Sequence, residues 1–118
     1  MLKQAAEKFI RVLAEKPALL PLYETATIKV CIQGDSERID LLFDNGSCSL
    51  IGNSPDADVV IKGDDPAIDS LLDGADRLFA LETSGALTVS GDQHDLLTLE
   101  SLFILTGEAA YFRRRESE

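Results

Sequence analysis

Few residues of the types that most often carry catalysis occur in this sequence. His94 is the only histidine, so the chain cannot form a metal site from several histidines. A Ser-His-Asp triad would have to be assembled around His94. This histidine follows Asp92 in the first turn of an expected helix, which favours a solvated surface residue. Cys31 and Cys48 lie in strand-like segments without CxxC spacing, and we expect both to be structural. We therefore predict a protein that is not an enzyme, with no catalytic residues, metal ligands or cofactor.

Acidic residues dominate the charge of the chain. The formal net charge at pH 7 is −10, and eleven acids between Gly34 and Asp76 stand against only Arg38 and Lys62. Most of these carboxylates fall in expected turns, helix starts and outward strand positions, so we assign them to solubility. A protein that binds along a nucleic acid needs a basic face to displace counterions. The sequence therefore predicts no nucleic-acid partner.

Secretion and membrane-spanning signals are missing from the sequence given. Residues 1–8 lack the apolar stretch of a signal peptide, and no apolar run approaches the ~20 residues of a transmembrane helix. Two cysteines without a secretion signal are typical of reduced thiols. We expect a soluble, cytoplasmic protein without stable membrane insertion.

The chain begins with a helical pattern. Apolar residues recur at helical spacing from Leu2 to Leu13, which predicts an amphipathic helix over residues 2–16 that Pro17 stops. Two prolines in residues 17–24 argue against regular structure in that connector.

Alternating apolar residues next predict a meander of three strands. The strands are expected at residues 28–33, 39–44 and 47–51. Asn45 and Gly46 tolerate positive φ and form the strongest short signal for a hairpin turn. One apolar and one mostly polar face indicate a sheet that is covered on one side only.

Two further strands and three helices complete the chain. In order, we expect a strand at 58–62, short helices at 66–73 and 76–82, a strand at 86–90 and a last helix that ends near 107. Asp65 is the expected N-cap of the first of these helices, and Asp92 is that of the last. This mixture with a one-sided sheet predicts a two-layer α+β domain.

The last helix is apolar around more of its circumference than a surface helix needs. Seven of the ten residues from Leu96 to Leu105 are apolar, whereas one stripe about 100° wide suffices for a helix on a sheet. The second apolar face must meet the segment Tyr111–Phe112, a partner chain, a ligand or the body of the protein. The 18 leucines and seven aromatic residues of the chain suit aliphatic walls around an acyl chain or isoprenoid, although ordinary cores are also rich in leucine.

The order of these elements and their short motifs resemble the sterol-carrier-protein-2 (SCP2) family over roughly residues 22–106. The resemblance rests on the hairpin at 44–46, the strand at 57–61 and the helix at 68–74. Its most distinctive piece is Ser84 to Asp92, which contains the family pattern Gly-x-Leu-x-Val-x-Gly-Asp.

We expect a single SCP2-like domain over residues 1–118. The free-standing N-terminal helix at 2–16, the connector after it and the tail at 108–118 depart from the family pattern. The resemblance implies a five-stranded, largely antiparallel sheet with helices on one face. An apolar tunnel between sheet and helices would hold a fatty acid, acyl-CoA, sterol or isoprenoid. The expected ligand-binding residues, for which plain core packing remains the alternative, are Leu71, Leu72, Leu78, Phe79, Leu99, Leu102 and Phe103.

Two functional hypotheses remain open at this point. The first is a non-enzymatic carrier of an apolar, lipid-like ligand. The second is an SCP2-like interaction module whose own leucines fill the tunnel, and which forms a homodimer or docks a partner protein. In the second hypothesis the free-standing helix from Leu2 to Leu13 is the expected contact element. The tail Tyr111–Arg115 could close a tunnel mouth or extend into solvent.

Overall fold

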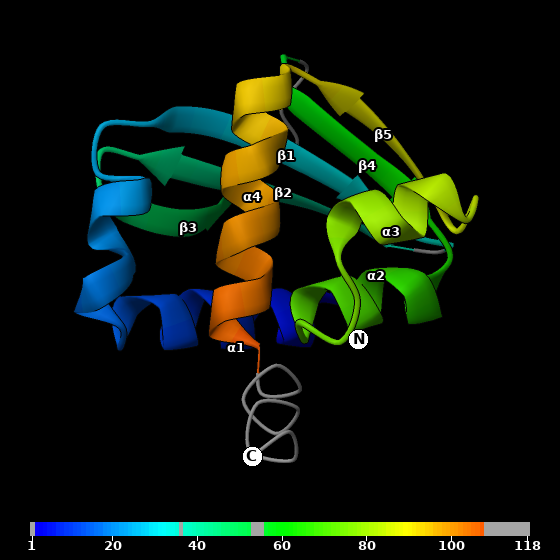
Figure 1. Cartoon of the computed structure of the whole chain (residues 1–118), viewed down its shortest axis with the longest axis horizontal. Coiled ribbons are helices and arrows are strands. Elements are labelled where there is room, and N and C mark those ends of the chain that lie inside the picture. The colour runs from blue at the N-terminus through cyan, green and yellow to red at the C-terminus, as the bar shows by residue number, and fades with distance from the viewer. Residues whose placement is uncertain (1, 36, 53–55, 108–118) are drawn as a thin grey trace.

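A computed structural model describes residues 2–35, 37–52 and 56–107 of the chain. Within them a five-stranded sheet is covered by helices on one face (Figure 1), which confirms the predicted two-layer α+β fold. The strands are β1 (Thr27–Gln33), β2 (Arg38–Asp44), β3 (Ser47–Ile51), β4 (Val59–Gly63) and β5 (Leu87–Gly91). The helices are α1 (Leu2–Ala14), the 3-10 helix η1 (Pro17–Leu22), α2 (Asp65–Leu72), α3 (Leu78–Thr83) and α4 (Gln93–Thr106).

The sheet has the order β3-β2-β1-β4-β5 and is mostly antiparallel, as expected. The predicted meander forms its first half: β2 pairs antiparallel with both β1 and β3. Asn45 and Gly46 turn the hairpin with φ angles of 46° and 91°. The one parallel pair joins β1 to β4, and β5 completes the sheet antiparallel to β4.

A single apolar layer lies between the sheet and the helices. Alternate strand residues such as Val30, Leu41 and Ile61 point into it, and each is at most 1% exposed. Along the middle of the sheet, α4 crosses the covered face, with α1, α2 and α3 around its lower half (Figure 1). Every helix named α therefore contributes side chains to the same core.

The N-terminal helix is part of this core, so the expectation of a free-standing helix is wrong. Leu2, Ala6, Phe9 and Leu13 are all at most 2% exposed. The Phe9 ring lies 5.0 Å from the ring of Phe103 on α4 and 6.2 Å from that of Phe43 on β2, measured between centroids. The amphipathic pattern of α1 reports burial within its own domain. The expected contact element of an interaction module is therefore not available.

Structure at the prolines also differs from the prediction. α1 ends at Ala14, two residues early, because a proline disfavours the helical conformation of the residue before it, here Lys16 at φ −119° and ψ 76°. The connector then forms η1 instead of irregular chain. Each proline is the second residue of a turn, closed by Leu19 N–H to Lys16 O and by Tyr23 N–H to Leu20 O. Proline is favoured there because that position needs no donor.

The helix starts follow the predicted capping chemistry with one shift. Asp64, not Asp65, caps α2: its carboxylate accepts a 2.8 Å hydrogen bond from Ala67 N–H. Pro66 then occupies the second helical position, where the missing N–H is not needed. Asp92 caps α4 as predicted and accepts from His94 N–H at 3.1 Å.

Candidate functional site

The seven expected ligand-binding residues lie on three helices around one part of the core. Leu71 and Leu72 belong to α2, Leu78 and Phe79 to α3, and Leu99, Leu102 and Phe103 to α4. All except the half-buried Phe79 are at most 4% exposed, and all pack in or against the same apolar cluster. They lie together in the layer between sheet and helices. Whether any of them contacts a ligand remains a prediction.

Within the described residues, the apolar layer offers no free hydrogen-bonding side chain. On the helix side of this layer, the buried polar residue is Thr106 of α4. Its hydroxyl donates to the carbonyl oxygens of Leu102 and Phe103 at 2.8 and 3.3 Å. The other buried polar residue, Asp40, lies on the opposite face of the sheet, where Arg38 pairs with it at 3.1 Å. A molecule inside the layer would meet mainly aliphatic and aromatic side chains, with the Thr106 hydroxyl, Tyr23 and the Cys48 thiol in or against the same cluster.

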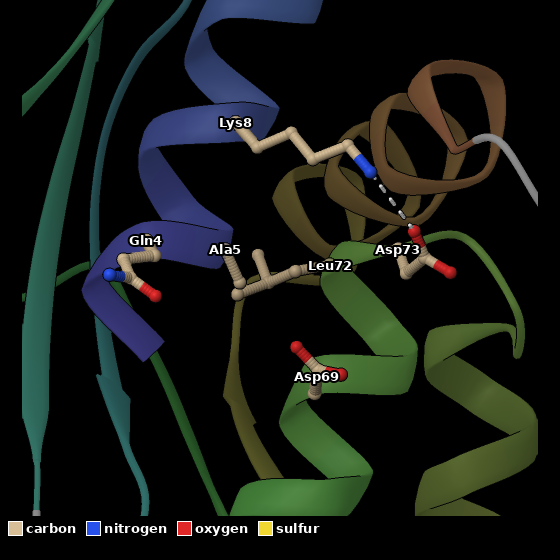
Figure 2. Close-up of a pocket in the computed structure, with 6 residues that line it drawn as sticks. All are labelled: Gln4, Ala5, Lys8, Asp69, Leu72 and Asp73. Carbon is tan, nitrogen blue, oxygen red and sulfur yellow. Dashed lines mark ion pairs between the residues drawn. The ribbon is translucent and has the colours of Figure 1, made fainter. Parts of the chain in front are cut away.

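A groove of about 370 Å³ lies between α1 and α2. Figure 2 shows Leu72 of α2 and Ala5 of α1 meeting at its centre, while Lys8 reaches across to Asp73. The Lys8 Nζ and Asp73 Oδ1 atoms are 3.7 Å apart, and both side chains are about two-fifths exposed. An ion pair so exposed stabilises by at most about 1 kcal/mol. Leu72, one of the candidate ligand-binding residues, therefore lies close to the surface in this groove, and the weak Lys8–Asp73 ion pair spans the groove above it.

Sequence reasoning missed the other residues of this groove. Gln4 and Lys8 lie four positions apart on one face of α1. Asp69 on α2 and Asp73 at its C-cap are also four positions apart and lie on one side of that helix. That spacing was readable from the sequence. The packing of these two helices against each other was not, because it depends on the position of α1 in the core.

A smaller hollow of about 200 Å³ lies at the N-terminal end of α3, between Arg77 and the outer face of α4. Glu100 of α4 lines it and accepts a 3.0 Å hydrogen bond from Phe79 N–H through Oε2. The hollow also exposes Ile104 and Leu105.

The second apolar face of α4 remains partly uncovered. Leu97 is 47% exposed and Leu105 is 38% exposed, and Leu20 and Leu22 of η1 are exposed as well. Lys16 Nζ donates to the Leu105 carbonyl at 2.9 Å, which caps the C-terminal end of α4. The tail from 108 to 118, expected to meet this face or to close a tunnel mouth, lies outside the described residues.

The structure also places the residues that were considered for catalysis. His94 is exposed at the start of α4, and both cysteines are free thiols. Burial raises the pKa of the Cys48 thiol to about 12 and also raises that of Cys31. In the part of the chain that the structure describes, no three His, Cys, Asp or Glu side chains gather to hold a metal. None of the helices described there is long and apolar enough to cross a bilayer.

A five-stranded sheet with helices packed over one face, around a single apolar layer, defines a two-layer α+β domain. The sequence from residue 3 to residue 104 matches the SCP-2 sterol transfer family. The chain therefore belongs to this family of lipid-transfer domains. The match begins inside α1, well before the residue 22 at which the resemblance was expected to start. A comparison with curated proteins found no match.

Solved structures share the fold. A protein described as "UbiJ-SCP2 Ubiquinone synthesis protein" superposes with a TM-score of 0.66 at 23% identity, over 81% of this chain and 82% of that one. A crystal structure of sterol carrier protein 2 gives 0.60 at 18% identity, over 91% and 93%. Palmitated SCP2L2 from Aedes aegypti gives 0.56 at 16% identity, over 82% and 92%. At these identities the likeness establishes the fold.

Proposed function

We propose that this protein binds one apolar, lipid-like molecule between the sheet and the helices and carries it without chemical change. The observation that carries the proposal is the composition of the apolar layer. Its walls are side chains such as Leu71, Leu99 and Phe103, all fully buried, and its buried hydroxyl is satisfied within its own helix. Such walls give a chain-like apolar ligand a favourable environment worth roughly 0.8 kcal/mol per buried methylene.

The ligand class follows from what the layer lacks. A sugar, nucleotide or peptide needs polar partners inside its site, and leaving its polar groups unpaired costs about 1–3 kcal/mol each. A fatty acid, acyl-CoA, sterol or isoprenoid needs none along its apolar part. The palmitated and ubiquinone-synthesis neighbours support this class, since their descriptions name lipid chemistry.

The ligand would lie among the candidate side chains, of which all but Phe79 are closed off from solvent in the present conformation. The α1–α2 groove marks where the layer comes close to the surface, because Leu72 and Ala5 form its centre. Binding therefore requires the helices to move outward from the sheet.

Carriage without catalysis accords with the chemistry of the described residues. Burial raises the pKa of the Cys31 and Cys48 thiols, which lowers their thiolate fraction at neutral pH, and His94 lies exposed at the start of α4. We also place the protein in the cytoplasm, and the two free cysteines support that placement.

Displacement of a fluorescent fatty acid by unlabelled lipids tests this function. Leu99→Ala enlarges the proposed site, so we expect it to shift the preference toward longer or bulkier lipids. Leu13→Ala removes an equally buried leucine of α1 outside the candidate set and is the matched control. Both variants lose about 2–5 kcal/mol of stability, which urea unfolding measures separately. If wild-type protein binds neither the probe nor any acyl, sterol or isoprenoid competitor, the proposal fails.

One specific observation supports the second function, that of an interaction module. Leu97 and Leu105 of α4, with Leu20 and Leu22 of η1, leave large apolar side chains in water. A ligand-free homodimer or a docked partner would cover them. Sedimentation of wild type and of the double variant Leu97→Ser, Leu105→Ser separates the two functions, because a carrier stays monomeric in both.

A further inference from the structure

Of the four α-helices, α3 contributes least to the core. Its six residues bury one side chain fully, Leu78, while Phe79 and Leu81 are half-buried. By contrast, α1 and α2 each bury four side chains. Separating α1 from α2 would expose that larger apolar surface. Lifting α3 exposes one fully buried side chain, Leu78, with the half-buried Phe79 and Leu81 and the part of β5 that α3 contacts. The apolar layer is therefore easiest to open at α3.

The N-terminal end of α3 is held by a neighbouring helix. Arg77 occupies the N-cap position and makes no side-chain hydrogen bond there, unlike Asp64 of α2 and Asp92 of α4. Glu100 supplies the missing acceptor from α4: its Oε2 receives the Phe79 N–H at 3.0 Å. A negatively charged acceptor at the N-terminal end of a helix also interacts favourably with the helix dipole. One carboxylate thus connects α3 to α4.

Both chain segments that flank α3 end in self-contained turns. α2 closes with Gly74 N–H to Leu71 O and Ala75 N–H to Ser70 O, and Gly74 has φ 75°. α3 closes in the same way, with Gly85 at φ 86° as the left-handed residue. Each is a Schellman motif, whose bonds stay within the helix it ends. These motifs therefore need not break when α3 moves, and a Cβ at Gly85 would have open space around it.

We propose that α3 is a lid over the apolar layer and that the Glu100 carboxylate is the latch that holds it shut. The inference rests on the proposed carrier function and adds the route by which the ligand enters. The hollow of about 200 Å³ lined by Arg77 and Glu100 marks the seam at which the lid separates from α4. When the Glu100–Phe79 bond breaks, α3 and its closing motif swing on residues 76–77 and on the junction of Ala86 with β5, and Leu78 leaves the core.

Hydrogen exchange of the ligand-free protein tests the latch without any lipid. Glu100→Ala removes the acceptor, so the amides of residues 79–83 should exchange about tenfold faster or more, while those of α2 and α4 keep their rates. Glu100→Gln keeps a neutral acceptor oxygen and should lie between that variant and wild type. Gln93→Ala changes an exposed residue of the same helix away from this hollow, so it is the control and should exchange like wild type.

Stopped-flow uptake of a fluorescent fatty acid tests the lid. Glu100→Ala should take up the probe about tenfold faster, with the same number of probes bound at equilibrium. Unchanged exchange of α3 in Glu100→Ala, or an equal rise in every helix, overturns the latch. Faster exchange without faster uptake overturns the lid. If wild type and variants take up no lipid, the proposed function fails, and the exchange data still decide the latch.

Discussion

At the scale of single residues, burial decides the chemistry of the two thiols. Cys48 faces the core side of the sheet, opposite Phe43 on β2, and burial alone raises its pKa from 9.0 to about 12. Above about pH 9 the unfolded chain therefore loses this proton while the native protein keeps it. Because the native state then binds more protons, the free energy of unfolding falls as pH rises from about 9 toward 12.

Alkylation by iodoacetamide reports this shift directly. The native thiolate fraction of Cys48 at pH 8 is roughly a thousandfold below that of an unshifted thiol. We expect native Cys48 to react at least about tenfold more slowly than in urea-unfolded protein. Its rate should keep rising between pH 8 and 10, whereas the unfolded rate levels off above about pH 9. Peptide mapping by mass spectrometry measures both, and a native rate that levels off near pH 9 would refute the assignment.

The sequence alone predicted best the residues whose place depends on their near neighbours in the chain. The surface position of His94 and the turn at Asn45–Gly46 follow from local sequence alone, and the structure confirms both. The groove residues Gln4, Lys8, Asp69 and Asp73 could not be predicted as a group. They share a hollow only because α1 and α2, which are far apart in the sequence, pack side by side, and no local pattern encodes that packing.

At the scale of elements, the ends of α2 and α4 approach each other closely. A Cβ on Gly74 would lie 2.6 Å from Gly107 Cα and 3.0 Å from the Phe103 carbonyl oxygen. Gly85, at the end of α3, has a similar positive φ but no heavy atom within 4 Å of its Cβ position. The two glycines therefore separate the cost of backbone conformation from the cost of close packing.

We predict that Gly85→Ala lowers the free energy of unfolding by about 1–2 kcal/mol, the cost of a left-handed L-residue. Gly74→Ala should cost at least about 2 kcal/mol more, because the backbone of α2 or α4 must also shift. Urea unfolding of both variants measures the difference. Equal losses would show that the two helix ends are not in close contact.

Errors at the element scale come from competition between neighbouring signals. Asp64 and Asp65 are both good caps, and the sequence offered no reason to prefer the first. The two prolines of residues 17–24 exclude an α-helix, but their four-residue spacing places each at the second position of a turn. A 3-10 helix satisfies that geometry, so η1 forms where irregular chain was predicted.

At the scale of the whole molecule, the role of α1 is the main revision. Its amphipathic pattern fitted either a contact surface or a core face equally well, because periodicity identifies a buried stripe without naming what buries it. The cluster of Phe9, Phe43 and Phe103 shows that the apolar stripe of α1 is a core face, because it joins α1, β2 and α4 in one core. The family match from residue 3 agrees that α1 belongs to the domain.

Fold class and sheet composition were predictable as a whole, whereas a ligand space was not. Alternation and turn signals predicted a one-sided sheet, and the structure confirms it. The seven candidate residues are the same kind of side chain that fills any core, and only a bound molecule distinguishes a carrier from a packed domain. The central claim is therefore about occupancy.

Native mass spectrometry of the protein purified from its own host, followed by organic extraction, measures that occupancy most directly. The account predicts a monomer that carries one acyl, sterol or isoprenoid molecule per chain, released by the extraction. A ligand-free dimer would favour the interaction module, with Leu97 and Leu105 at its contact. A ligand-free monomer that also fails to take up a fluorescent fatty acid would contradict the carrier function.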